Sequence, residues 1–255
     1  MSTGFLIELL GPNVKYAIIS DIHANLEALE AARAEIGRIA PDKVLNLGDL
    51  VGYGASPAEC IEAARHLAHV TIAGNHDFGV AGLTDIRYFN SYARRAVLWT
   101  AGVLKQADID YLKSLALSHV EDGAFRLVHA TPSDPGRWDY IFGRDQALAE
   151  FAAFPEPICF IGHSHQAGIF EMDEHGLVAR GGDSVTISAG RKYLINVGSV
   201  GQPRDGDPRA GICVFDADRG EVRLVRVAYD IEGAKRRIVD AGLPPILAHR
   251  LSYGE

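Results

Sequence analysis

Side chains that can bind metal ions follow several short apolar runs of this sequence. After residues 70–73 (VTIA) comes Gly-Asn-His-Asp, which brings an amide, an imidazole and a carboxylate together. Similar donors follow four other apolar runs. The candidate ligands are Asp21, His23, Asp49, Asn75, His129, His163 and His165. Oxygen and imidazole donors without a thiolate suit divalent Mn, Fe, Co, Ni or Zn.

The number of candidate ligands favours two ions over one. A catalytic zinc ion usually takes three protein ligands and keeps an open position, so these donors are too many for one such ion. Two ions about 3.5–4 Å apart fit a site with a shared ligand. Asp49 is the natural bridge, because it is central in the order of the candidates and follows a glycine.

Alternating strand and helix patterns in the first half of the chain must position these side chains. Residues 15–20, 43–49 and 69–74 contain the short apolar runs of buried strands. Between them, residues 24–37 and 57–68 have the composition and spacing of helices. This order predicts parallel strands joined by right-handed crossovers.

The predicted sheet explains how distant residues could meet. In an open α/β sheet, ligands bind at the carboxyl ends of the strands, so the polar side chains that follow each strand can converge there. In an extended chain, alternate residues project to the same side. Asp21 and His23 should therefore face one target, and so should His163 and His165.

After residue 77 the predicted secondary structure changes twice along the chain. Residues 78–122 have helical patterns and no strand signal. Two buried strands, two β-hairpins and an amphipathic helix follow, at residues 125–130, 157–162, 167–182, 211–229 and 230–243. We expect one domain over residues 1–255, an α/β fold of two sheets covered by helices. The helical insertion at about 78–122 is a candidate lid.

Composition limits the classes of partner. A net charge of −8 disfavours a broad surface for long nucleic acid or for an anionic membrane. No run approaches the roughly 18 apolar residues of a membrane span. The three cysteines are far apart and form no Cys-x-x-Cys pair, and the N-terminus makes a poor signal peptide. These features predict a cytoplasmic protein without a membrane anchor.

Five motifs in order resemble one known superfamily. They are Asp21-x-His23, Gly48-Asp49, Gly74-Asn75-His76-Asp77, the strand-terminal His129, and Gly162-His163-x-His165. Together they resemble the calcineurin-like metallophosphoesterase superfamily over residues 15 to about 205. The stretches DIHANLEAL, GDLVGYG and NVGSVGQPR are similar to those of its small bacterial and archaeal phosphodiesterases.

The resemblance implies a fold and a division of the ligands. The expected fold is a four-layer α-β-β-α sandwich of two mixed sheets flanked by helices. One divalent ion would be held by Asp21, His23, Asp49 and His165. The other would be held by Asp49, Asn75, His129 and His163.

The resemblance also implies an activity. A hydroxide that bridges two ions would attack the phosphorus of a small phosphodiester or nucleotide, with diesters expected over monoesters. His76 is in position to protonate the leaving oxygen. Asp77 would keep that imidazole charged and oriented, as carboxylates beside metal sites commonly do.

Residues next to the motifs are candidates for substrate contacts. Arg204, Asn25 and Tyr53 are assigned this role, and Arg137 and Trp138 could line the entrance. Residues 88–95 (YFNSYARR) leave two alternatives, helix packing or a platform on which bases stack.

Other functions remain open at this point. A protein Ser/Thr phosphatase is disfavoured, because that family carries an arginine pair where this chain has Gly52-Tyr53-Gly54. Some proteins of this fold are non-catalytic scaffolds or regulators, but those typically lose ligands or the histidine at position 76. The C-terminal hairpins are a candidate edge for a homo-oligomer.

Overall fold

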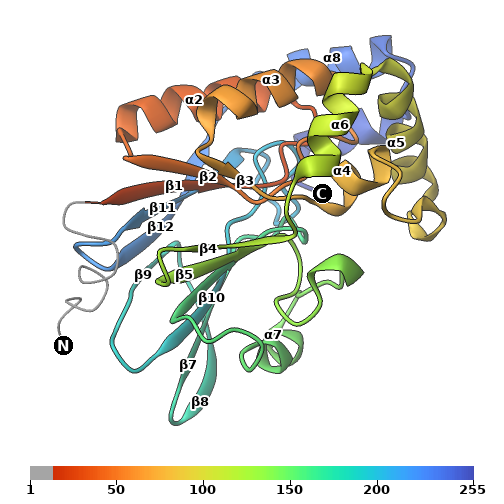
Figure 1. Ribbon diagram of the computed structural model, residues 1–255. Coiled ribbons are helices and arrows are strands. Elements are labelled where there is room, and N and C mark those ends of the chain that lie inside the picture. Colours follow the sequence, from red (N-terminus) through yellow and green to blue (C-terminus); the bar gives the residue numbers. More distant parts are fainter. Residues whose placement is uncertain (1–13) are drawn as a thin grey trace.

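The computed structural model describes residues 14–255, and two six-stranded mixed sheets lie face to face at its centre (Figure 1). The first sheet has the order β3-β2-β1-β11-β12-β9. Its strands are β1 (Lys15–Ile19), β2 (Lys43–Asn46), β3 (Val70–Thr71), β9 (Ser184–Thr186), β11 (Ala210–Asp216) and β12 (Glu221–Val227). Residues 1–13 lie outside this range, so the expectation that the N-terminus is a poor signal peptide and the start of the domain at residue 1 concern residues that are not described.

The second sheet has the order β4-β5-β6-β10-β7-β8. Its strands are β4 (Ser118–Glu121), β5 (Phe125–Val128), β6 (Ile158–Ile161), β7 (Gly168–Asp173), β8 (Gly176–Arg180) and β10 (Lys192–Asn196). In each sheet three neighbouring strands are parallel: β3, β2 and β1 in the first, and β5, β6 and β10 in the second. The ends of these strands supply the candidate ligands.

An aromatic core joins the two sheets. Phe125 of β5 packs edge-on against Tyr16 of β1, with ring centroids 5.1 Å apart, and against Phe215 of β11 at 5.7 Å. All three side chains are fully buried. Large rings of this kind contribute much apolar area to a core, so the contact holds the sheets at a fixed separation.

Helices cover the outer faces of both sheets. On the first sheet lie α2 (Leu26–Ile39) and α3 (Pro57–Leu67), which connect the parallel strands. The helix α2 buries Ala28, Leu29, Ala32 and Ile36 at helical spacing. On the second sheet lies α7 (Arg144–Glu150) (Figure 1). The predicted four-layer sandwich is therefore confirmed.

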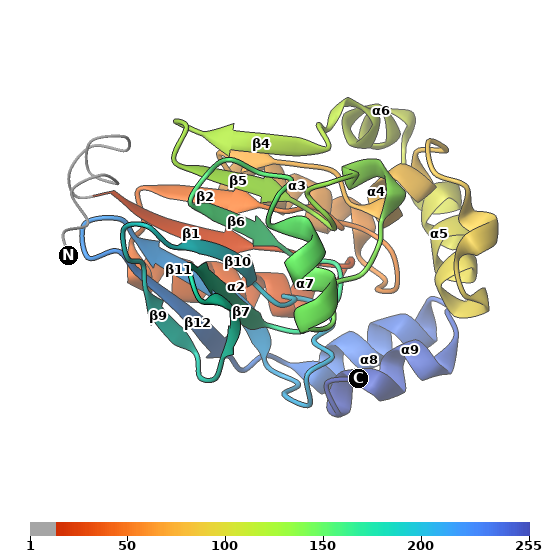
Figure 2. The same ribbon diagram turned by 90° about the horizontal axis from the view of Figure 1, so that it is seen from below.

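The remaining helices gather at one end of the sheets (Figure 2). They are α4 (Asn75–Val80), α5 (Ser91–Val103), α6 (Gln106–Ser114), α8 (Ile231–Asp240) and α9 (Pro245–His249), with the short 3₁₀ turns η1 (Ile86–Tyr88), η2 (Pro135–Arg137) and η3 (Arg250–Ser252). Within residues 14–255, no helix has the length and apolar character needed to cross a membrane.

The structure corrects the predicted insertion. Residues 118–121, expected to carry no strand, form β4, which pairs antiparallel with β5 as the edge of the second sheet. Its sequence Ser-His-Val-Glu is too polar and too short to show an apolar run, and pairing with β5 decides its conformation. The two predicted hairpins are confirmed as β7–β8 and β11–β12.

Candidate metal centre

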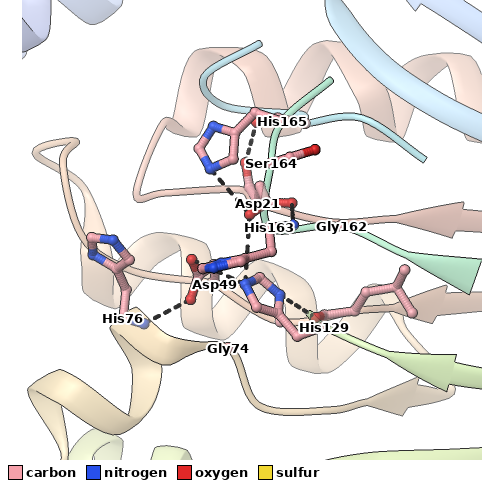
Figure 3. A network of polar contacts seen from close by, with 12 residues as sticks. Asp21, Asp49, Gly74, His76, His129, Gly162, His163, Ser164 and His165 are labelled. Carbon is pink, nitrogen blue, oxygen red and sulfur yellow. Dashed lines mark hydrogen bonds and ion pairs between the residues drawn. The ribbon is translucent and has the colours of Figure 1, made fainter. Parts of the chain in front are cut away.

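The candidate ligands meet where the parallel strands of both sheets end (Figure 3). Asp21 and Asp49 follow β1 and β2, and Asn75 begins α4 just beyond β3. His129 follows β5 directly, and His163 follows β6. Every one of these side chains, with His23 and His165, is at most 6% exposed. The chain thus brings seven buried donors from two sheets together.

Several of these residues have an unusual backbone. Asp21, His23, Asp49, His163 and His165 all have positive φ, between 49° and 66°. A left-handed backbone is uncommon for residues other than glycine and costs about 1–3 kcal/mol where it is strained. The extended chain expected around Asp21 and around His163 is therefore wrong, because left-handed turns aim these side chains.

Four ligand atoms form the first cluster. One atom each from Asp21, His23, Asp49 and His165 lies within 4.8 Å of the others. Asp21 Oδ1 is 3.2 Å from His165 Nε2, and Asp49 Oδ2 is 3.5 Å from His23 Nε2. The two Nε2 atoms of His23 and His165 are 3.0 Å apart.

The second cluster shares Asp49 with the first. Ligand atoms of Asp49, His129 and His163 lie within 4.8 Å of one another, and Asp49 Oδ2 is 3.4 Å from His129 Nε2. Asn75 lines the same cavity as His163. The first cluster has the four residues of the first expected set, and the second has three of the four residues of the second, without Asn75. That these residues bind metal ions stays a prediction.

Backbone carbonyl groups fix how the histidines point. The Nδ1 atoms of His23, His129 and His165 lie 3.0, 2.8 and 2.6 Å from the carbonyl oxygens of Val51, Leu47 and Gln202. Because Nδ1 of each ring contacts a carbonyl oxygen, Nε2 is aimed at the centre, an arrangement typical of metal ligands.

His163 is the exception in this group of histidines. Its Nε2 lies 2.9 Å from the carbonyl oxygen of Trp138, so Nδ1 is the ring atom left for a ligand. Its ring also stacks on Tyr140, with centroids 4.0 Å apart and planes 17° apart. Sequence analysis missed the part that Tyr140 and the Trp138 carbonyl play, because neither residue lies in a motif.

The donor set fits divalent cations. Asp21 Oδ1, Asn75 Oδ1 and His129 Nε2 are buried and have no hydrogen-bond partner among the described residues. The Nε2 atoms of His23 and His165 face each other at 3.0 Å, so one cation could contact both. Buried acceptors without donors are costly, and a bound cation removes that cost. The residues present therefore fit bound divalent cations.

Electrostatics within the cluster favours neutral histidines at two positions. Burial lowers the pKa of His163 to about 4 and that of His165 to about 3. Burial also opposes charge on His129, but the carboxylates of Asp49 and Asp21 outweigh it and raise its pKa to about 9. Nearby histidines hold the pKa of Asp21 well below its usual range against the effect of burial. Nearby histidines likewise lower the pKa of Asp49 against the effect of burial, so both carboxylates favour the ionised form.

Two glycines permit the close approach of the ligand loops. A Cβ atom on Gly74 would lie 2.1 Å from Asp49 Oδ1, and one on Gly162 would lie 2.6 Å from Asp21 Oδ2. Such contacts are far shorter than real side chains allow, so any other residue would push these carboxylates out of place.

His76 lies beside the shared carboxylate. Its backbone N–H donates to Asp49 Oδ1 at 2.8 Å, as Figure 3 shows. Its ring is 4.9 Å from that of His23 and 4.5 Å from that of Tyr53, and its buried Nδ1 has no partner among the described residues. Burial lowers the pKa of His76 well below its usual value. The ring is near the ligands and free of other hydrogen bonds.

Asp77 does not orient His76, contrary to the prediction. Asp77 Oδ2 accepts from the backbone N–H groups of Asp49 and Gly74 at 2.8 and 3.0 Å, and Oδ1 accepts from Val51 at 3.3 Å. Its two oxygens are therefore engaged with main chain. Burial and Asp49 raise its pKa to about 7, opposed by these amide donors. Asp77 ties the loop after β2 to the start of α4.

The predicted substrate contacts divide into two groups. Asn25 caps α2 by accepting from the Ala28 N–H at 3.1 Å, and its Nδ2 donates to the Gly201 carbonyl at 2.8 Å. The assignment of Asn25 to substrate is therefore wrong, since the N-cap position decides its contacts. Tyr53 lines a cavity at the site, and the guanidinium of Arg204 lies over its ring at 5.4 Å.

A cavity of about 430 Å³ opens beside the clusters. Its inner wall includes Asn75, His76 and His163, and Arg137 and Trp138 line it further out. Residues 83–93 of the predicted insertion form much of the remaining wall. The insertion thus borders the site, while a lid motion stays a prediction.

The fold and the site define a metallophosphoesterase, and comparison with known proteins gives the same class. The family model of the calcineurin-like phosphoesterase superfamily domain matches residues 14–220. The chain therefore belongs to the calcineurin-like phosphoesterase superfamily, a family of metal-dependent phosphoesterases.

Three known proteins are similar over nearly the whole chain. An uncharacterized protein of Methanocaldococcus jannaschii is 42% identical over 241 residues, which are 93% of this chain and 97% of that protein. A metallophosphoesterase from Sphaerobacter thermophilus, known from its crystal structure, is 39% identical with a TM-score of 0.83 and covers 95% of this chain and 100% of its own. A hypothetical protein of Pyrococcus horikoshii shares the fold, with 19% identity, a TM-score of 0.77, and coverage of 95% of this chain and 99% of its own.

Proposed function

We propose that this chain is a dimetal phosphoesterase that hydrolyses small phosphodiesters or nucleotides. The observation that carries the proposal is the pair of buried ligand clusters that share Asp49. A shared carboxylate suits a two-metal site, because it lets two cations lie close together.

The ligand sets of the proposal follow the two clusters. Asp21, His23, Asp49 and His165 would hold one ion. The second would be held by Asp49, Asn75, His129 and His163. Nitrogen and oxygen donors of this kind suit Mn, Fe, Zn, Ni or Co. When bound, two such ions supply Lewis acidity and neutralise the negative charge of a phosphate ester.

His76 is the proposed general acid for the leaving oxygen. Its ring lines the cavity where an ester group would lie, and its Nδ1 has no partner among the described residues. Burial favours the neutral ring, whereas the Asp49 carboxylate favours the charged one. A phosphate anion bound beside it acts in the same direction as Asp49 and favours the proton.

Diesters are proposed over monoesters because of the space beside the site. A diester carries a second substituent, and the cavity next to His76 and His163 offers about 430 Å³ for it. Tyr53 and Arg204 lie next to each other near this wall. They remain proposed contacts, with Arg204 suited to a phosphate oxygen.

A cytoplasmic location is also proposed. Cys60, Cys159 and Cys213 are buried and unpaired, and burial raises the pKa of all three thiols. Free buried thiols are typical of proteins in a reducing compartment.

Hydrolysis of bis(p-nitrophenyl) phosphate tests the proposal. The purified protein is loaded separately with Mn, Fe, Zn, Ni and Co, its metal content is measured, and turnover is followed before and after chelation. We expect about two ions per chain and turnover that chelation removes and added metal restores. Metal binding without turnover under any of the five ions would instead favour a scaffold.

A further inference from the structure

The cavity beside the metal centre has an unusual composition. Of its 15 lining residues, five are aromatic: Tyr53, Tyr88, Phe89, Trp138 and Tyr140. Aromatic residues make up one third of this wall but only 8% of the chain. Leu83 and Ala93 are its aliphatic members, which makes the wall a poor match for an acyl chain. A flat ring system suits it better.

Two segments form most of the outer wall. One is residues 83–93, which follow α4, and the other is residues 136–140, in the loop after β5. They are joined by a hydrogen bond of 3.1 Å from Trp138 Nε1 to Thr84 Oγ1. Since this loop also supplies the carbonyl that contacts His163, the outer wall is continuous with the metal centre.

The charges of the outer wall do not favour a polyphosphate. Of the described residues that line the cavity, Arg137 is the one Lys or Arg, and its Nε lies 2.8 Å from Asp139 Oδ2. The lining residue Asp85 is likewise paired with Arg87 at 2.6 Å. An uncharged group with polar edges therefore fits better than a further chain of phosphates. The hydroxyl, amide and carboxylate groups of the wall can meet such edges.

Tyr88 is a tyrosine with a free ring face. Its side chain is 87% exposed, and no hydrogen bond or ring contact links it to another described residue. The alternative of helix packing, left open for residues 88–95, is therefore wrong for Tyr88. Tyr140, by contrast, stacks between His163 and Phe142, at 4.0 and 5.0 Å. Tyr88 is left as the ring that a planar ligand could cover.

We propose that this cavity binds the nucleobase of a nucleoside phosphodiester, with Tyr88 as the stacking surface. The inference rests on the proposed function, because it assumes that the phosphate lies at the two clusters. The base would occupy the outer wall and its phosphate the inner end next to His76 and His163. Every base has a face that can stack, so the site selects nucleosides without selecting a sequence.

A pair of chromogenic esters tests the inference. Thymidine 5′-(p-nitrophenyl) phosphate and methyl p-nitrophenyl phosphate have the same leaving group and differ in whether a base is present. We expect the wild-type protein loaded with Mn to favour the thymidine ester by about tenfold in kcat/KM, in line with one stacked base. Tyr88→Ala should raise KM for the thymidine ester by about fivefold to tenfold and leave the methyl ester unchanged.

Tyr92→Ala is the matched control. Tyr92 is on α5, is 52% exposed and does not line the cavity. Its loss should leave both esters within about twofold of wild type, as is usual for surface changes. Equal turnover of the two esters, or an equal loss of both in Tyr88→Ala, would overturn the inference while the phosphoesterase stands. No turnover of either ester would contradict the proposed function itself.

A binding measurement gives a second readout without turnover. The chain has two tryptophans, Trp99 in α5 and Trp138 in the cavity wall. In a Trp99→Phe background, thymidine 5′-monophosphate should quench the fluorescence of Trp138, and Tyr88→Ala should weaken that binding about fivefold. Inorganic phosphate should not reproduce the quench. If phosphate quenches equally, or if Tyr88→Ala binds as tightly as wild type, no base lies in the cavity.

Discussion

The inner and outer ends of one cavity are built in opposite ways. At the inner end, the seven candidate ligands are at most 6% exposed, and main-chain groups form hydrogen bonds with the side chains of six of them. At the outer end, Tyr88 is 87% exposed and Leu83 is 55% exposed. The inner end comes from strand ends and the outer end from loops and short helices. Under the proposed function, this difference means that the sheets fix the residues of the chemistry, while the residues of substrate choice lie on segments that can change independently.

The strongest way to break the inner end is to remove its shared carboxylate. Asp49→Asn replaces the carboxylate that both clusters share with a neutral amide, whose single oxygen cannot serve both. We expect turnover of bis(p-nitrophenyl) phosphate to fall to the level of the chelated protein, and metal content to fall below two ions per chain. Activity and elemental analysis measure both. A variant that keeps two ions and normal turnover would show that Asp49 is not the bridge.

The next largest effect should come from His76→Ala. The proposed acid is lost while all seven ligands remain, so turnover should fall by about 10²–10⁴-fold with metal content unchanged. Added imidazole should restore part of the rate, because the truncated side chain leaves room in a buried site. His175→Ala, in the exposed turn between β7 and β8, is the control and should match wild type. Loss of metal in His76→Ala would mean that His76 helps to hold the metal ligands in place and is not shown to be the general acid.

A smaller effect is expected where the inner end is tied together. In Asp77→Asn, an amide N–H₂ group faces backbone N–H groups that donate hydrogen bonds to the carboxylate of the wild type. Because two donors then face each other, the free energy of unfolding should fall by about 2 kcal/mol. Denaturant unfolding measures it. Asp145→Asn, at an exposed position in the first turn of α7, is the matched control. Equal stability of the two variants would mean that Asp77 does not tie the loops.

The smallest effect should come from the outer end. Thr84→Val keeps the shape of the side chain but removes the acceptor for Trp138 Nε1. Losing one such hydrogen bond costs about 1 kcal/mol, so KM should rise about fivefold with kcat nearly unchanged. Thr186→Val in β9, exposed in the first sheet, controls for the substitution itself. A fall in kcat without a change in KM would mean that the bond serves the metal centre more than the cavity.

The sequence was most informative where residue type and position agree. Asp21, Asp49 and His129 each follow a short apolar run, and the carboxyl ends of parallel strands meet at one edge, so their convergence could be predicted. Two sheets covered by helices were predicted because hairpin and strand–helix patterns are local, and the resemblance to the superfamily implied their four-layer order. The contacts of Asn25 and Asp77 could not be predicted, because these side chains form hydrogen bonds with backbone groups of distant segments.

The outer wall shows a second limit. Tyr88 and Tyr140 are ordinary aromatic residues in the sequence, and nothing in their spacing tells a packed ring from a free one. Burial depends on which segments lie against them, and the edge strand β4 was missed for the same reason. Short polar elements take their structure from their neighbours more than from their own propensity.

The left-handed backbone of Asp21, His23, Asp49, His163 and His165 has a consequence for anyone who would rebuild this centre elsewhere. Grafting the same amino acids onto ordinary extended strands would aim their donor atoms apart, since the turn, and not the side chain alone, sets the direction. A transplant must carry the loops with their flanking glycines. β-Branched replacements at these five positions should strain the backbone at positive φ, in addition to removing a candidate ligand.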